Sequence, residues 1–250
     1  MATAAALAIF PATRTTTNKK GIASFLTEAQ FALMEALMTP KRAKAGSCLF
    51  WEGEPTGKLI YIRAGKVVLR KTTEDGKSLI LSILQAGDLI GEMGGAIDTV
   101  HGYSAEVMDN AELGILTWKD LEALLAAHGD IAVPFMNWMA LNRRVSESKL
   151  RDLLLFGKPG ALASTLIRLA NSYGIACADG IRISLKLTNT ELAEFIGTTR
   201  ESVNRMLNAM KDEGTIDMQP GRIVIRNLSA LRQLAGCPDC PACPKEVCSI

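Results

Sequence analysis

The chain has 250 residues, of which 48% are hydrophobic and 22% charged, and its formal net charge is only +2. This composition excludes a wholly disordered chain and predicts two ordinary domains, since domains cluster near about 100–150 residues. The apolar runs, such as residues 4–10, are far shorter than the roughly 20 residues that span a bilayer, and no cationic stretch precedes that run as in a secretory signal. We therefore expect a cytoplasmic protein with no membrane partner.

The first half of the chain has the sequence pattern of a small β domain. Residues 1–22 are rich in Ala and Thr and are predicted to be a flexible leader, and a short helix is expected from Ser24 to near Pro40. From residue 46 to about residue 116, short β-prone runs alternate with turn residues such as Asp75-Gly76. This alternation predicts an antiparallel β-roll, a sensor-like domain over residues 23–132.

A long helix is predicted over residues 133–156, because from Thr117 onward the apolar residues follow the spacing of a helix. One set of its side chains follows in steps of three and four residues: Trp138, Leu141, Val145, Ser148, Asp152 and Leu155. This heptad pattern predicts the dimerisation helix of a homodimer, and the alternative is that the same stripe packs on the chain's own roll. Asp152 is unusual there, because a buried carboxylate must reach water, a basic side chain or a metal.

The sequence beyond this helix predicts a winged helix-turn-helix over residues 157–234. The run Gly157-Lys158-Pro159-Gly160 is expected to break the helix and mark a domain boundary. Capping boxes at Thr188–Glu191 and Thr198–Glu201 predict two helices joined by a tight turn at Gly197. The β-prone residues around Pro220-Gly221 predict the wing.

The second of these two helices has the polarity of a DNA-reading helix. Val203, Met206, Leu207 and Met210 form one apolar stripe, and polar residues occupy the opposite side. Arginine can bind the edge of guanine in the major groove, and a carboxylate can accept a hydrogen bond from cytosine. We therefore expect this helix to bind double-stranded DNA, and the alternative is that it is an ordinary surface helix. The candidate DNA-binding residues are Thr198, Thr199, Arg200, Glu201, Ser202, Asn204 and Arg205.

Four cysteines crowd the last fourteen positions, and they define a candidate metal-binding tail over residues 235–250. They are Cys237, Cys240, Cys243 and Cys248. A disulfide framework would spread its cysteines through a small secreted chain, so this crowding favours metal ligation. The spacing is close to that of ferredoxins around a [4Fe–4S] cluster, but thiolates also bind zinc, and the spacing alone leaves both open.

The order of these parts resembles the cyclic-AMP receptor/FNR superfamily of bacterial transcription regulators. The resemblance rests on residues 91–94 (Gly-Glu-Met-Gly) and on the string from Leu187 to Arg205, and it covers about residues 24–234. It implies an α+β fold with a cyclic-nucleotide-binding-like β-roll, a long dimerisation helix and a C-terminal winged helix-turn-helix. It further implies a homodimer on an inverted-repeat operator with TGTGA half-sites, and RNA polymerase as a partner.

Two features refine what the resemblance implies. Tyr103-Ser104 stands where nucleotide-binding members have an Arg-Ser pair that binds the cyclic phosphate, so no cyclic nucleotide is expected. The tail is similar to that of FNR from bacilli, whose C-terminal Cys-x2-Cys-x4-Cys holds a [4Fe–4S] cluster, and the matching residues are Cys240, Cys243 and Cys248.

In that subfamily the fourth ligand is an aspartate at the end of the dimer helix, which corresponds to Asp152, with Cys237 as the alternative. We therefore expect an oxygen-responsive regulator of anaerobic gene expression, and not an enzyme. A zinc- or thiol-redox-responsive regulator, or a small-ligand-gated one, is the alternative within the same superfamily.

Overall fold

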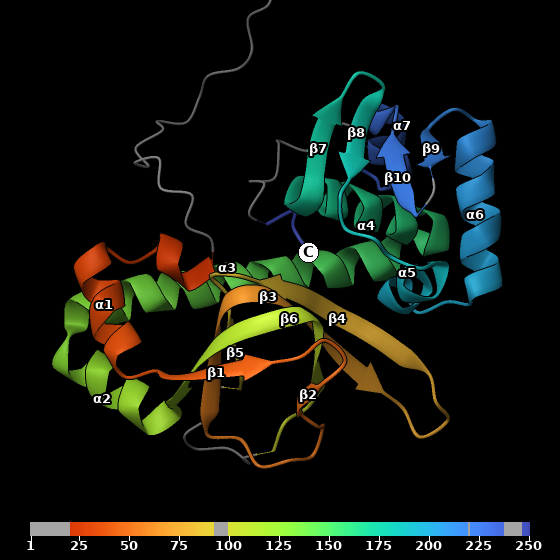
Figure 1. Ribbon diagram of the computed structural model, residues 1–250. Coiled ribbons are helices and arrows are strands. Elements are labelled where there is room, and N and C mark those ends of the chain that lie inside the picture. Colours follow the sequence, from red (N-terminus) through yellow and green to blue (C-terminus); the bar gives the residue numbers. More distant parts are fainter. Residues whose placement is uncertain (1–20, 93–99, 220, 238–246) are drawn as a thin grey trace, which may run out of the picture.

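The computed structural model describes residues 21–92, 100–219, 221–237 and 247–250. Figure 1 shows a β-roll on one side of the long helix α3 (Gly129–Leu155) and a smaller part with helices and a short sheet on the other. The predicted α+β architecture is confirmed. No helix in these described ranges is long and apolar enough to cross a bilayer.

The β-roll is built on two long strands, β3 (Lys58–Thr72) and β6 (Ser104–Thr117), which pair antiparallel from Lys58↔Thr117 to Arg70↔Ser104. The sheet order is β1-β6-β3-β4, with β2 paired to β6 and β5 paired to β3. The other elements are η1 (Gly21–Ser24), α1 (Glu28–Ala36), β1 (Thr39–Ala43), β2 (Cys48–Phe50), β4 (Ser78–Gln85), β5 (Leu89–Ile90) and α2 (Trp118–Ala127).

Two local predictions in this half have different outcomes. The turn at Asp75-Gly76 joins β3 to β4, and the amide of Gly76 donates to Thr73 O at 2.9 Å, as the hairpin pattern predicts. The boundary of the predicted leader is wrong, because η1 begins at Gly21 and the side chain of Ile22 is fully buried. The first predicted helix is present as α1, which is shorter than predicted because it begins only at Glu28 and ends at Ala36.

The helix α3 begins four residues before its predicted start at residue 133 and contains Pro134. A proline lacks the N–H that would bond to the carbonyl four residues earlier, here that of Asp130. Gln30 of α1 supplies the missing donor, since its Nε2 lies 3.0 Å from Asp130 O. A contact with another helix therefore lets α3 continue through the proline.

The C-terminal part is organised around the buried helix α4 (Gly157–Tyr173). The predicted helix break is present, because α3 ends at Leu155 and both Phe156 and Gly157 leave helical geometry, Gly157 with a φ of +62°. The break is shorter than the predicted four-residue run, since residues 158–160 already lie in the first turn of α4. A four-stranded antiparallel sheet has the order β7-β8-β10-β9. The remaining elements are β7 (Gly174–Cys177), β8 (Gly180–Ile183), α5 (Asn189–Ile196), α6 (Arg200–Asp212), β9 (Ile216–Gln219), β10 (Arg222–Ile225) and α7 (Leu228–Leu234).

The two parts share one apolar core as well as α3. Ile80 and Ile83 of β4 belong to the same buried cluster as Phe195 of α5. An ion pair also joins them, because Arg70 Nε of β3 lies 3.3 Å from Glu194 Oε2 of α5. The orientation of α5 is therefore set partly by the roll.

Candidate functional site

The first helix of the helix-turn-helix, α5, begins and ends at the predicted residues. Thr188 Oγ1 accepts from the Glu191 amide at 3.1 Å, and Glu191 Oε2 accepts from the Thr188 amide at 2.7 Å, which completes the predicted capping box. Gly197 ends the helix with a φ of +58°, a left-handed conformation that favours glycine. The sequence alone therefore fixes the limits of this helix.

A lysine from another element holds the same turn. Lys158 of α4 donates from Nζ to Ile196 O at 2.8 Å and to Gly197 O at 3.0 Å. A cation at the C-terminal end of a helix also interacts favourably with the helix dipole. Sequence reasoning missed this residue, because it lies 38 residues before the first carbonyl that it caps.

The second helix, α6, has one cap rather than the predicted second capping box. Thr199 is the N-cap, and its Oγ1 accepts from the Ser202 amide at 3.3 Å. A capping box needs Glu or Gln at the third helical position, which is Ser202 here, so Glu201 comes one residue too early. A hydrogen bond from its own backbone amide instead lowers the pKa of Glu201 and keeps this carboxylate ionised.

The candidate DNA-reading residues divide into those that are exposed and those with roles within the motif. Arg200, Glu201 and Arg205 are exposed, opposite the buried Val203, Leu207 and Met210. The other candidates are partly buried or form hydrogen bonds within the motif. Thr198 is partly buried, and Thr199 caps the helix. Ser202 accepts from Thr199 Oγ1 at 3.2 Å, and Asn204 accepts from Asn189 Nδ2 of α5. The exposed candidates are thus two cations and one carboxylate.

Most of the predicted dimerisation stripe of α3 faces its own chain, although its last residue, Leu155, is 70% exposed. Trp138 is 5% exposed and packs against Phe135 in the apolar core beneath α2 and α3, so its prediction as a contact with a second subunit is wrong. Leu141 and Val145 are partly buried, and Ser148 Oγ accepts from Arg168 Nη2 at 2.8 Å. Trp138 thus packs on its own chain, as the alternative prediction for this stripe states.

The exposed apolar side chains of α3 lie mainly on the other side of the helix. They are Val133, Met136, Met139, Leu150, Leu154 and Leu155. At about 100° per residue, all but Val133 and Leu155 fall roughly opposite the stripe from Trp138 to Asp152, and these two lie to one side of it. The exposed apolar face of α3 is therefore not the face that the heptad pattern predicts for dimerisation.

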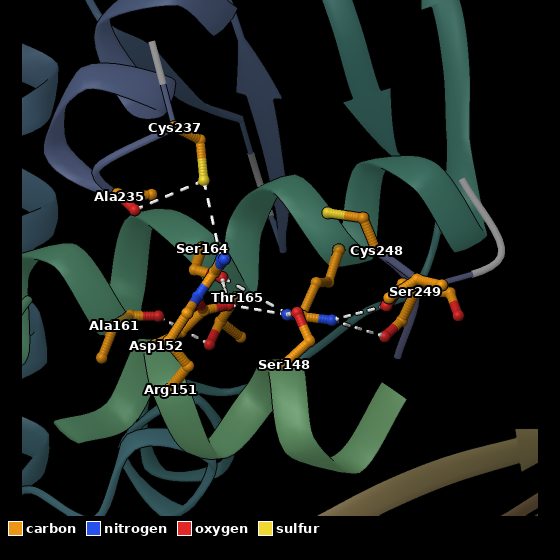
Figure 2. Close-up of polar contacts among 12 residues, drawn as sticks. Ser148, Arg151, Asp152, Ala161, Ser164, Thr165, Ala235, Cys237, Cys248 and Ser249 are labelled. Atoms are coloured by element: carbon orange, nitrogen blue, oxygen red, sulfur yellow. Dashed lines mark hydrogen bonds and ion pairs between the residues drawn. The ribbon is translucent and has the colours of Figure 1, made fainter. Parts of the chain in front are cut away.

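Asp152 is buried, with 4% of its surface exposed, and all its partners are cationic or hydroxyl side chains. Oδ1 accepts from Arg151 Nε at 2.9 Å and Nη2 at 2.7 Å, and Oδ2 accepts from Arg168 Nη2 at 2.6 Å and from Ser164 Oγ. Burial raises the pKa of Asp152, but the hydrogen bonds from Ser164, Arg168 and Arg151 outweigh it and hold the pKa below its usual range. The basic side chains that the sequence argument required are thus present (Figure 2).

The described tail residues are linked to Asp152 through the same arginines. Arg151 Nη2 lies 3.8 Å from Cys237 Sγ (Figure 2). Arg168 Nη1 donates to Val247 O, next to Cys248, at 3.0 Å. Cys240 and Cys243 lie outside the described residues. Within the described ranges, no three His, Cys, Asp or Glu side chains lie close enough to hold a metal ion.

At the predicted nucleotide position of the roll, Tyr103 takes the place of an arginine. Its ring centroid lies 5.8 Å from that of Phe50, and burial raises the pKa of Tyr103 to about 12, so the phenol is neutral at physiological pH. Ser104 Oγ accepts from the Glu52 amide at 2.9 Å. Neither side chain of this pair offers a positive charge to a phosphate, and Met93 and Gly94 of the neighbouring motif lie outside the described residues.

A winged helix-turn-helix with an exposed cationic face, joined to a β-roll by a long helix, defines a DNA-binding transcription regulator. Residues 160–234 match the family of Crp-like helix-turn-helix domains, and residues 40–128 match the cyclic nucleotide-binding domain. The chain is 40% identical over 223 residues to the anaerobic regulatory protein of Bacillus subtilis, covering 88% of this chain and 92% of that protein.

Other relatives give the same classification. The cAMP-activated global transcriptional regulator CRP of Salmonella typhimurium is 31% identical over 182 residues, which cover 72% of this chain and 85% of that protein. A CooA mutant from Carboxydothermus hydrogenoformans has the same fold, with a TM-score of 0.73 at 18% identity over 86% of this chain and 96% of that one. The chain belongs to the cyclic-AMP receptor/FNR superfamily of bacterial transcription regulators, and it is not an enzyme.

Proposed function

We propose that this regulator responds to oxygen and controls anaerobic gene expression. In the proposal, a homodimer binds an inverted repeat with TGTGA half-sites when a [4Fe–4S] cluster is intact, and it acts with RNA polymerase in the cytoplasm. The observation that carries the proposal is the contact of Cys237 with Arg151, the neighbour and partner of Asp152. The name of the Bacillus subtilis relative, an anaerobic regulatory protein, supports it.

The donor set fits such a cluster. Cysteine thiolates are the usual ligands of iron–sulfur clusters, and Cys240, Cys243 and Cys248 would supply three of them. Asp152 is proposed as the fourth ligand, and it could offer an oxygen only by giving up one of its present donors. Cys237 is the alternative, since its sulfur lies 3.8 Å from Arg151 Nη2, and this same nitrogen donates to Asp152. The cluster would supply a redox-labile centre that oxygen destroys.

The chain itself offers a route from the tail to the DNA-reading helix. Asp152 of α3 bonds to Ser164 and Arg168 of α4, and α4 forms the buried centre of the part that carries α5 and α6. A change at Asp152 would therefore alter how α4, and with it α6, is held against α3. In a dimer this geometry decides whether the two α6 helices lie one DNA turn apart, roughly 34 Å, as palindromic half-sites require.

We infer that the dimer forms through the exposed apolar face of α3. Val133, Met136, Leu150 and Leu154 are each 56–70% exposed, although they are large apolar side chains on one side of a 27-residue helix. Large apolar side chains that are exposed in this number on one side of a helix are typical of interaction sites in soluble proteins. A second copy of the chain is the partner that a palindromic operator calls for.

The deciding experiment reconstitutes the protein anaerobically and measures iron, sulfide, the visible spectrum and affinity for a TGTGA palindrome before and after air. We expect tight binding only with the cluster present. Asp152→Ala and Cys237→Ser distinguish the two candidate fourth ligands, and Cys177→Ser, at an exposed cysteine of β7, is the matched control. Zinc as the only bound metal, or affinity that is unchanged by cluster loss, would overturn the proposal.

A further inference from the structure

Arg168 of α4 uses every N–H of its side chain although it is only 3% exposed. A guanidinium has five N–H donors, and five contacts are present. Nε donates to Ser164 Oγ at 3.3 Å, Nη1 to Val247 O at 3.0 Å and Ser249 O at 3.3 Å, and Nη2 to Ser148 Oγ at 2.8 Å and Asp152 Oδ2 at 2.6 Å. One buried side chain thus joins α3, α4 and the C-terminal residues.

The last four residues are held on α4 mainly by their backbone. Asn171 Nδ2 donates to Cys248 O at 2.7 Å, and the Ile250 amide donates to Ser172 Oγ at 3.0 Å. The Val247 side chain is buried, with 6% of its surface exposed. These contacts involve no thiol, so they can hold the segment whether or not the cysteines bind a metal.

We propose that Arg168 is a positioning residue that anchors residues 247–250 to α3 and α4. If the segment leaves, both Nη1 donors lose their carbonyl partners, and the guanidinium keeps only its contacts on α3 and α4. The segment and the Arg168–Asp152 pair therefore stabilise each other reciprocally. Where the tail binds a cluster, which rests on the proposed function, Arg168 holds the backbone on both sides of Cys248 with the same guanidinium that bonds to Asp152.

The test measures amide hydrogen exchange of residues 247–250 by mass spectrometry in the cluster-free protein. Arg168→Met should speed this exchange at least about tenfold, because the segment loses two buried hydrogen bonds. Arg168→Lys, which keeps the charge but cannot reach all five acceptors, should fold and give a smaller increase. Arg144→Met, at an exposed arginine of α3, is the matched control and should leave the exchange unchanged. Exchange of the α6 peptide reports whether the domain remains folded.

A second readout connects the segment to the metal. After anaerobic reconstitution, Arg168→Met should bind less iron than wild type and show an altered visible spectrum, and Arg168→Lys should restore part of both. Wild-type protection of residues 247–250 in either variant would overturn the inference and leave the proposed function intact. A wild-type protein that takes up no iron, with a tail still loosened by Arg168→Met, would instead overturn the proposed function alone.

Discussion

The substitution Asp152→Asn tests how strongly the buried carboxylate holds α3 to α4. The asparagine keeps the shape and one acceptor oxygen but removes the negative charge between Arg151 and Arg168. Arg168, 3% exposed, would then be a buried cation without a carboxylate partner. The contact between the two helices should weaken as a result.

The magnitude follows from the cost of breaking a buried ion pair by removing one partner, about 3–5 kcal/mol. Arg151 is more exposed than Arg168, with 38% of its side chain accessible, so most of the loss falls on the Arg168 side. For a protein of this size, each kcal/mol lowers the melting temperature by roughly 2–4 °C. We therefore expect Asp152→Asn to melt about 6–20 °C below wild type.

The assay is thermal and urea unfolding of the metal-free protein, followed by circular dichroism. Asp179→Asn is the control, since Asp179 is exposed between β7 and β8 and should change stability by less than about 0.5 kcal/mol. A loss below about 1 kcal/mol for Asp152→Asn would refute the reasoning, because the arginines would then not depend on the carboxylate.

The same carboxylate predicts a dependence of stability on pH. The pKa of Asp152 is lowered from its ordinary value of 3.8 in the folded protein. A lowered pKa gives stabilisation that is complete above the ordinary value and is lost as the pH falls through the folded-state pKa. Wild type should therefore lose more unfolding free energy than Asp152→Asn below about pH 4, and parallel pH profiles would contradict this.

Three further substitutions test the DNA-reading helix, the turn and the open face of α3. Arg205→Ala should weaken binding to a TGTGA palindrome about 5- to 150-fold in fluorescence anisotropy, while Arg232→Ala on α7 should not; an equal loss on unrelated DNA would rule out base reading. Lys158→Met should destabilise the protein by about 1 kcal/mol in urea unfolding, because two carbonyls lose their donor, whereas the exposed Lys186→Met should not; equal effects would contradict the capping role. Leu154→Glu should shift the protein to monomers in analytical ultracentrifugation, and Asn142→Glu, at an exposed position elsewhere on α3, should not; a dimeric Leu154→Glu would exclude this face.

The features that the sequence determined by itself are those decided by near neighbours in the chain. Thr188 and Glu191 are three residues apart and complete the capping box of α5, and Gly197 ends that helix because only glycine adopts a left-handed conformation at little cost. The turn at Asp75-Gly76 and the two-faced character of α6 follow from equally short patterns. The order of the roll, the long helix and the winged helix could therefore be predicted without coordinates.

The tertiary structure alone decided which side of α3 meets which partner. A heptad count gives the spacing of a stripe but not what covers it, and here Trp138 enters the chain's own core while Leu150 and Leu154 remain exposed. Apart from the adjacent Arg151, the partners of Asp152 and the donors to the tail carbonyls come from residues 12–81 positions away, at a distance where no local pattern records a contact. Buried polar groups take whatever partners the packed elements bring to them, and this selection is a property of the folded chain.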